Sequence, residues 1–284
     1  MFCIGMCVKN SQFGLEYNII NNLKKLNSYF KNLQIIVAYE SSSDKSLELL
    51  IKYNEVYKNM IICDVTELNI KITSNRYRTK RIANARNKIV EVIRSEFSNC
   101  EYFAMMDTNN YSCIGDINLS ALDYIFENKD KWDSVSFDRE AGYYDDWALS
   151  FEPFVYSFFH FENFQHVVGL MREYKKKYIC DKNEGEFIKV LSAFNGFAIY
   201  KTSVFIDCIY DDKIIINLFK ETYIKNQVNL VQRKILPVLY GDCEHRHFHL
   251  QAIKNKDARI FICKKSLFKK IPKKPEGVEL RGPA

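Results

Sequence analysis

The chain has few of the residues that interrupt regular structure. Its 284 residues include 5 Pro and 10 Gly, with no linker rich in Pro, Gly or Ser, which excludes collagen-like and linker-dominated proteins. No run of about 18 apolar residues is present, so no membrane-spanning helix is expected. The apolar start, residues 1–8, is short and is followed by Lys9-Asn10, so no secretory leader is expected either. We expect a soluble, cytoplasmic protein.

Closely spaced cysteines are also missing. Nine cysteines are scattered without a Cys-x-x-Cys pair, and the nearest two are Cys3 and Cys7. This spacing speaks against a cysteine zinc site and is typical of buried thiols in a reducing compartment. Apolar residues make up 47% and aromatic residues 14% of the chain, which is enough to build a large globular core.

Positive charge is concentrated at one end. The formal net charge is +6, and residues 264–284 contribute +5 through six Lys and Arg281 against Glu276 and Glu279. The other residues therefore carry about +1. We expect a solvated basic tail, with contact to an anionic membrane surface as the alternative. A near-neutral body argues against nucleic-acid binding, which needs a broad basic surface.

Strand and helix patterns alternate through the first 110 residues. This order predicts a mainly parallel sheet with helices on both faces, within one continuous α/β domain. The expected strands are 2–8, 34–39, 60–65 and 102–106, and the expected helices are 16–30, 45–57 and 78–97, with a loop at 66–75. The second half is mixed, with helices at 119–128 and 166–178, strands at 133–137 and 194–200, an aromatic loop at 138–165 and a loop-to-strand segment at 231–240.

Polar residues follow the predicted strands directly. They are Asn10, Glu40, Asp64 and Asp107. Ligands of such sheets bind beyond the carboxyl ends of the strands, so these four side chains are predicted to share one functional edge.

Asp107-Thr108-Asn109 could hold a divalent cation. Oxygen ligands suit Mg²⁺ or Mn²⁺, and residues two apart on an extended backbone point to the same side. An Asp-x-Asn segment is also a common turn, and the sequence leaves both interpretations open.

Residues 76–87 form a basic segment without an acidic residue. Arg81 lies on a polar helical face, whereas Arg86 comes four residues after Ile82 and leans towards the apolar stripe. A buried arginine needs an anionic partner, which could be a phosphate or Asp107. The alternative is a solvated basic face with an internal Arg–Asp pair at its edge.

The segment 241–249 places His245, His247 and His249 at alternating positions beside Asp242 and Glu244. In an extended conformation the three imidazoles would lie on one face, where they could bind a metal such as zinc. One histidine could instead complete a site begun by Asp107.

The loop 141–149 combines aromatic rings with carboxylates. Sugar faces stack on rings and sugar hydroxyls bond to carboxylates, so this loop is a candidate carbohydrate surface. The alternative is a packed loop in which Asp145 or Asp146 caps a turn. Asn195-Gly196 is either a turn or a close backbone approach to a ligand.

Taken in order, five segments resemble GT-A glycosyltransferases, close to the fungal capsule-associated (CAP59-like) mannosyltransferase group and related enzymes of large DNA viruses. The resemblance covers about residues 1–250. It rests on RTKRIANARN (78–87), MMDTNN (105–110), YYDDWAL (143–149), FNGFAIY (194–200) and DCEHRHF (242–248). The Asn- and Lys-rich composition also suits an AT-rich viral genome, and thus a place in the host-cell cytoplasm.

The resemblance implies a nucleoside-diphosphate sugar donor, UDP-sugar favoured and GDP-sugar as the alternative, with bound Mn²⁺ or Mg²⁺. Residues 1–115 would bind the donor, 116–263 would bind the acceptor and carry catalysis, and 264–284 would be the tail. Asp107 and Asn109 would replace the family's Asp-x-Asp, at the loss of one charge, with His245, His247 or His249 completing the metal shell. Glu40 and Asp64 would contact the base and ribose of the donor, Arg78, Arg81 and Arg86 would hold its diphosphate, and Asn10 would be a further donor contact.

The implied reaction moves a hexose-type sugar to a glycan or glycoconjugate hydroxyl. If it inverts, a carboxylate must deprotonate the acceptor. The resemblance points to Glu244, with Asp242, Asp145 and Asp146 as alternatives, and a retaining mechanism stays open. The acceptor or sugar contacts would be Tyr144, Asp146, Trp147, Asn195 and Gly196. Competing interpretations are a catalytically degenerate GT-A-like glycan-binding protein and a sugar nucleotidyltransferase.

Overall fold

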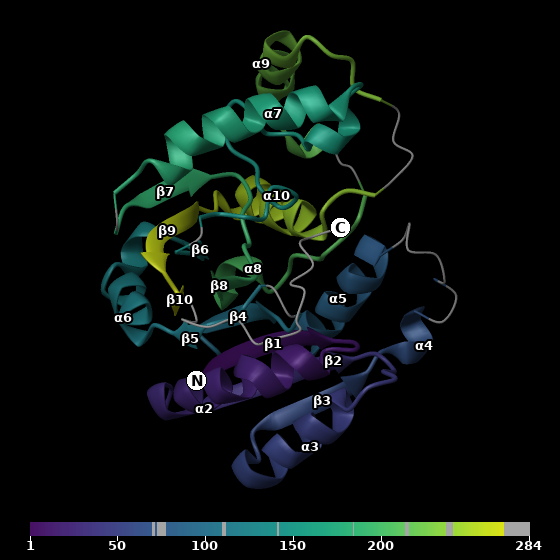
Figure 1. Ribbon diagram of the computed structural model, residues 1–284, viewed down its shortest axis with the longest axis vertical. Helices are drawn as coiled ribbons and strands as arrows, with labels where there is room; N and C mark the ends of the chain where they lie inside the picture. The colour runs from purple at the N-terminus through teal and green to yellow at the C-terminus, as the bar shows by residue number, and fades with distance from the viewer. Residues whose placement is uncertain are drawn as a thin grey trace.

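The computed structural model describes residues 1–69, 72, 78–109, 112–140, 142–183, 185–213, 216–236 and 241–269. A mixed sheet of eight strands runs through the molecule in the order β3-β2-β1-β4-β8-β6-β9-β7, and helices cover both of its faces (Figure 1). This architecture confirms the predicted α/β class with a mixed second half.

The first four strands are parallel and adjacent. They are β1 (Phe2–Val8), β2 (Leu33–Tyr39), β3 (Met60–Asp64) and β4 (Tyr102–Asp107). The helices between them are α1 (Gln12–Gly14), α2 (Ile20–Tyr29), α3 (Ser46–Tyr57), α4 (Thr66–Asn69) and α5 (Arg78–Glu96), and a π-helical turn at Leu15–Ile19 joins α1 to α2. Neither α1, which precedes the expected helix 16–30, nor α4 was predicted; α4 lies in the expected loop 66–75, of which residues 70, 71 and 73–75 are outside the described residues.

The second half adds strands of both directions. β8 (Phe197–Lys201) is antiparallel to β4 and to β6 (Ser134–Asp138), β9 (Ile260–Ser266) is parallel to β6, and β7 (Phe187–Val190) is antiparallel to β9. The helices are α6 (Leu119–Glu127), α7 (Phe164–Lys175), α8 (Thr202–Phe205), α9 (Glu221–Val231) and α10 (Glu244–Lys256), with a π-helical turn at Lys176–Cys180 and 3-10 turns at Lys129–Lys131, Phe158–His160 and Ile216–Leu218. A small ribbon pairs β5 (Asp116–Ile117) with β10 (Phe268–Lys269).

Two boundaries differ from the expectation. Residue 231 ends α9, and the expected strand at 231–240 is represented among the described residues by a single bridge between Ile235 and Phe161; residues 237–240 lie outside them. Residues 264–269 belong to β9 and β10, because their apolar members Leu267 and Phe268 are buried. The basic tail is therefore shorter than predicted, and residues 270–284 lie outside the described part.

Alternating strand residues build a separate core on each face of the sheet. Ile4 and Met6 of β1 pack on the face of α2 and α6, whereas Cys3 packs with α5 on the opposite face. Gly5 allows α5 to approach closely, because a Cβ there would lie 2.4 Å from Cγ2 of Ile89. This packing holds α5 across β1 and β2 and fixes where its basic N-terminal end lies.

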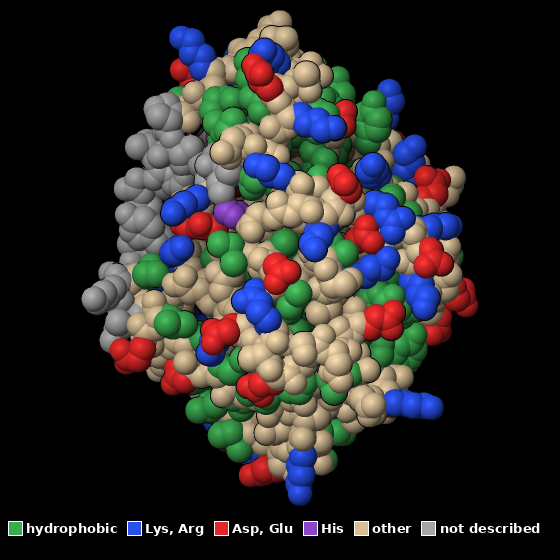
Figure 2. Space-filling view, turned by 180° about the vertical axis from the view of Figure 1, so that it is seen from behind, with side chains coloured by type: hydrophobic (Ala, Val, Ile, Leu, Met, Phe, Trp, Pro, Cys, Tyr) green, Lys and Arg blue, Asp and Glu red, His purple; other side chains and the backbone are tan. Residues whose placement is uncertain are grey.

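The surface carries charges of both signs. On the face seen in Figure 2, Lys and Arg side chains are interspersed with acidic ones and do not gather in one broad patch. Within the described ranges, none of the helices combines the length and apolarity needed to cross a membrane.

Candidate functional site

The carboxyl ends of the parallel strands meet at one edge of the sheet. Cys7 of β1 is opposite Asp107 of β4, and Tyr39 of β2 is opposite Asp64 of β3. Glu40 follows directly after β2, and Asn10 is two residues after the end of β1. Asn10, Glu40, Asp64 and Asp107 thus lie at one edge of the sheet, as predicted, but each side chain has different hydrogen-bond or ion-pair partners.

Asn10 and Asp64 close loops at this edge. The side-chain oxygen of Asn10 accepts the N–H of Ser43 at 2.8 Å, which ties the loop after β1 to the loop after β2. Asp64 accepts the N–H of Thr66 at 2.8 Å, a hydrogen bond that begins α4 and lowers the pKa of Asp64. Both residues have local structural roles in the absence of a ligand.

Glu40 binds Arg81. Its carboxylate is paired with Arg81 and Lys9 and accepts the side-chain N–H of Asn69 at 3.0 Å. Burial raises the pKa of Glu40. Glu40, expected to contact the nucleoside, and Arg81, expected to hold the diphosphate, are therefore paired with each other. Arg78 is exposed at the start of α5.

The centre of the edge is a group of four side chains that we call the Arg86 cluster: Arg86, Asp107, Glu244 and His245. Arg86 is 5% exposed. Its Nη2 lies 3.0 Å from Oδ1 of Asp107, and its Nη1 contacts both Glu244 and His245. Its guanidinium also lies over the ring of Phe194 at 4.7 Å. The predicted inward direction of Arg86 is confirmed, and of the two anions left open, a phosphate or Asp107, the structure pairs it with Asp107.

The charges of the Arg86 cluster do not cancel. Burial raises the pKa of Glu244, an effect that Arg86 opposes, and burial together with Arg86 lowers the pKa of His245, which keeps that imidazole neutral. Burial disfavours the Arg86 cation, but Glu244 and Asp107 outweigh it and raise the pKa of Arg86. One cation thus faces two carboxylates. Of the two carboxylates only Asp107 reaches the surface, where its side chain is 25% exposed, and Arg78 also acts on the charge of Glu244.

Asp107 is held from three sides. Its backbone N–H donates to the carbonyl of Gly196 at 2.8 Å, and its Oδ2 accepts the hydroxyl of Ser112 at 3.1 Å. The hydroxyl of Tyr144 donates to the same Ser112 oxygen at 2.7 Å. The side-chain oxygen of Asn109 accepts the N–H of Ser112 at 2.7 Å, as the turn interpretation expects. Ser112 was not predicted, because one serine in a loop carries no recognisable signal.

Asn195 and Gly196 form a left-handed turn, with φ values of 57° and 88°. A Cβ at Gly196 would lie 2.6 Å from the Cβ of Ser112. The close approach is therefore to another part of this chain. Asn195 accepts the N–H of Tyr144 at 3.1 Å and donates to the carbonyl of Phe137 at 2.8 Å, so this turn positions Tyr144 beside Asp107.

The carboxylates of the aromatic loop bind the protein itself. Asp145 accepts the N–H of Ala148 at 3.1 Å, as the capping interpretation expects, and burial raises the pKa of Asp145 to about 6. Asp146 is paired with Lys175 of α7 at 2.6 Å and with Arg172 at 3.1 Å. Trp147 packs edge-on against Phe159, with ring centroids 4.6 Å apart.

The segment 241–249 does not meet the condition for a shared histidine face, because it is not extended and α10 begins at Glu244. Residues two apart on a helix differ by about 200° in direction, so the three histidines do not share one face. His245 and His249 stack with centroids 5.9 Å apart, and His249 Nδ1 lies 2.9 Å from the hydroxyl of Ser192. Burial lowers the pKa of His249 to about 3. His247 is on another side of the helix, where Asp211 influences its charge.

Asp242 anchors the start of α10. It accepts the N–H of Cys243 at 2.7 Å and binds Nε of Arg246 at 2.9 Å. Burial alone would raise the pKa of Asp242, but Arg246 and His160 outweigh it and hold that pKa below its ordinary value. Asp242 is therefore a buried, charged anchor.

The side-chain atoms of Asp107 and Asn109 that could bind a metal ion are oxygen atoms. Across the described ranges, no three His, Cys, Asp or Glu side chains are grouped so as to hold a metal ion, which removes the three-histidine zinc site. Asp107, with its excess negative charge at the surface, nevertheless suits a hard cation such as Mg²⁺ or Mn²⁺. Water and donor oxygens would have to supply the other ligands.

The sequence matches no protein-family model and no curated protein. Similar solved structures include glycosyltransferases. Residues 1–349 of S. aureus TarS in complex with UDP are 13% identical over 95% of this chain and 60% of that chain, with a TM-score of 0.48. Galactosyltransferase LgtC with donor and acceptor sugar analogues is 12% identical over 92% and 72%, with a TM-score of 0.39.

Glucosyl-3-phosphoglycerate synthase of Mycobacterium tuberculosis, in complex with Mn²⁺, UDP and phosphoglyceric acid, is 8% identical over 72% of this chain and 57% of that chain, with a TM-score of 0.38. The chain spans 36% of the longer TarS chain and about 60% of the shorter one. Identities and TM-scores this low carry no argument for the substrate, metal or mechanism of this chain.

Proposed function

We propose that the chain is a GT-A glycosyltransferase. It moves a hexose-type sugar from a nucleoside-diphosphate sugar, UDP-sugar in preference to GDP-sugar, to a hydroxyl of a glycan or glycoconjugate. The observation that carries the proposal is the Arg86 cluster. It gathers residues of three of the motifs that resemble this family at the carboxyl edge of a parallel sheet, where α/β proteins bind ligands.

The donor contacts come from the N-terminal half. Asn10, Glu40 and Asp64 meet the nucleoside, and Arg78 and Arg81 meet the diphosphate. Asp107, assisted by Asn109, holds Mn²⁺ or Mg²⁺, which when bound supplies positive charge to the departing diphosphate. The excess negative charge of the Arg86 cluster supports this assignment.

Glu244 is the proposed base of an inverting reaction. Burial raises its pKa, which makes its carboxylate a stronger base towards the acceptor hydroxyl, and Arg86 holds this carboxylate in one orientation. Asp145, with a pKa of about 6, is the alternative. Asp242 is a weaker candidate because Arg246 stabilises its charged form.

Contacts within the protein at Glu40 and Asn109 favour a second candidate function. Glu40 is neutralised by Arg81, and Asn109 closes a turn, as in a catalytically degenerate GT-A domain that binds glycans without transferring them. Within the proposed family, we assign the chain to the group of the fungal capsule-associated and large-virus enzymes that its motifs resemble; a viral enzyme would act in the host-cell cytoplasm.

The deciding experiment is a panel of UDP- and GDP-sugars with and without Mn²⁺. Binding is measured by thermal shift, and slow release of the nucleoside diphosphate is measured in parallel. A selective, Mn²⁺-enhanced response to one donor is expected. A folded protein that responds to none of the sugar nucleotides would move the assignment to the degenerate binder.

A further inference from the structure

Two phenylalanine rings beside the aromatic loop face solvent. Phe159 is 46% and Phe164 is 42% exposed, whereas Phe158, His160 and Phe161 between and beside them are buried. The two exposed rings stack on each other with centroids 5.3 Å apart and an interplanar angle of 25°. We call Phe159, Phe164 and the adjoining Trp147 the aromatic ledge. An aromatic ring exposed to water is less favourable than a buried one, so a ligand that covers Phe159 and Phe164 would gain free energy.

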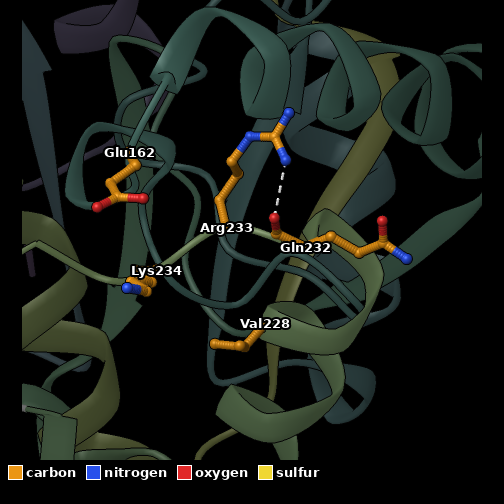
Figure 3. A pocket seen from close by; sticks show the side chains of 5 residues that line it. All are labelled: Glu162, Val228, Gln232, Arg233 and Lys234. Carbon is orange, nitrogen blue, oxygen red and sulfur yellow. Dashed lines mark hydrogen bonds between the residues drawn. The ribbon is translucent and has the colours of Figure 1, made fainter.

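A polar hollow adjoins the aromatic ledge. It has a volume of about 510 Å³ and is lined by Glu162, Val228, Gln232, Arg233 and Lys234 (Figure 3). Glu162 lies in sequence between the two exposed rings. Its N–H donates to the carbonyl of Lys234 at 3.0 Å, and Phe161 bridges Ile235, so the backbone fixes the hollow next to the ledge.

The ledge is connected to α10, the helix that begins at the proposed base Glu244, by direct contacts. Phe159 packs on Trp147 at 4.6 Å. The carbonyl of Trp147 accepts an N–H of Arg246 at 2.7 Å, and Arg246 is two residues after Glu244 on α10. Side chains two residues apart on a helix point in directions about 200° apart, so the ledge contacts the side of α10 that faces away from Glu244.

We propose that the ledge and the hollow bind an oligosaccharide, namely the non-reacting part of the acceptor. Flat aromatic faces match the C–H faces of sugar rings. The hollow offers hydroxyl-binding groups of both kinds, with Glu162 accepting, Arg233 and Lys234 donating, and Gln232 doing both. Its volume falls within the about 300–1,000 Å³ typical of ligand pockets. The charged side chains of Glu162, Arg233 and Lys234 in the adjoining hollow make a lipid surface a poorer match.

This inference rests on the proposed function but is tested separately from the donor site. Wild-type protein is titrated with chitotetraose, maltotetraose and mannotetraose at up to millimolar concentration, by calorimetry and by the intrinsic fluorescence of its two tryptophans, Trp132 and Trp147. Phe159→Ala and Phe164→Ala are compared with Tyr178→Ala, which removes an equally exposed ring (43%) from the C-terminal end of the same helical segment. UDP binding and thermal midpoints are measured for each variant.

We expect one oligosaccharide to bind, and each phenylalanine variant to weaken it about tenfold or more, with UDP binding and folding unchanged and Tyr178→Ala like the wild type. Absence of binding by all three oligosaccharides, or equal binding by the phenylalanine variants, overturns the inference. So does a wild-type dimer in sedimentation that these variants convert to monomers, because the ledge would then be a self-interface. Glycan binding without any nucleotide binding would instead remove the donor half of the proposed function and leave the ledge as a glycan site.

Discussion

Arg86 and Glu244 are 158 residues apart in sequence, yet their side chains form an ion pair in the interior, where neither is more than 6% exposed. Buried ion pairs of this kind contribute little net stability, but the loss of one partner leaves the other charge without compensation. Arg86 also holds Asp107, so it positions both proposed reactive carboxylates at once.

Replacing Arg86 by Ala should therefore lower the free energy of unfolding by about 3–5 kcal/mol, measured by urea denaturation. Arg172→Ala is the matched control. It removes an arginine from a pair with Asp146 in which the arginine side chain is 64% exposed, and such pairs contribute at most about 1 kcal/mol. Similar losses in the two variants would contradict the buried role of Arg86.

Asp107→Asn should abolish the Mn²⁺-dependent part of UDP-sugar binding. The substitution keeps the size of the side chain but removes the excess negative charge that would attract the cation. Isothermal titration with UDP, with Mn²⁺ and with EDTA, measures the effect. The exposed carboxylate of Asp116 (68%) supplies the control variant Asp116→Asn. Mn²⁺ that enhances binding equally in Asp107→Asn and wild type would exclude Asp107 as a metal ligand.

The stability of the protein should depend on Asp145 between pH 4 and 6. Burial raises the pKa of this carboxyl from 3.8 to about 6 in the folded protein, so the folded state holds its proton more tightly than the unfolded state. The free energy of unfolding must then fall as pH rises through this window. Asp145→Asn removes this pH-dependent contribution to the free energy of unfolding. The stability of the variant relative to wild type should therefore increase from pH 4 to pH 6, by at most about 3 kcal/mol.

Only the change with pH tests the titration of Asp145, because the amide also alters the hydrogen bonds to Ala148 and Asn195 at every pH. Urea denaturation at several pH values, with Asp116→Asn as a control, provides the comparison. A constant difference between Asp145→Asn and wild type across the window would show that the pKa of Asp145 is not raised.

His249→Ala should destabilise the fold by about 2–4 kcal/mol, because it empties a fully buried site and leaves the hydroxyl of Ser192 without its partner. Its Mn²⁺ affinity, measured by titration of the paramagnetic signal, should equal that of the wild type. NMR titration should also find His249 neutral down to about pH 4, because burial lowers its pKa to about 3. A loss of Mn²⁺ affinity in a folded variant would return His249 to the metal site.

The first half of the sheet was predictable because each of its strands is short, apolar and followed at once by a polar residue. Strand ends of a parallel sheet meet at one edge, so the neighbourhood of Glu40, Asp64 and Asp107 followed from local patterns alone. The pairing of Arg86 with Asp107 was predictable for a similar reason, since an arginine on an apolar helical stripe needs an anion. Glu244 as the second partner was not, because nothing local relates positions 158 residues apart.

The histidine segment was misassigned because its alternation matches a strand while its other signals match a helix. Glu244 in the first turn and Lys254 and Lys256 in the last complement the helix dipole, and Phe248 and Ala252 share an apolar face at helical spacing. Asp145 and Asp146 could not be assigned to sugar or to protein from sequence, because their partners on the turn at 146–148 and on α7 become visible only in three dimensions.

The antiparallel β8 has a consequence for dissecting the protein. It is inserted beside β4, and the carbonyl of Gly196 accepts the N–H of Asp107 at the point where the strands meet. A fragment ending at residue 115 would leave the hydrogen-bonding groups of β4 open to pairing with other chains. The N-terminal half should therefore aggregate when expressed alone and recover solubility when the C-terminal half is co-expressed, which makes this boundary a site for split-protein complementation rather than a border between independent folding units.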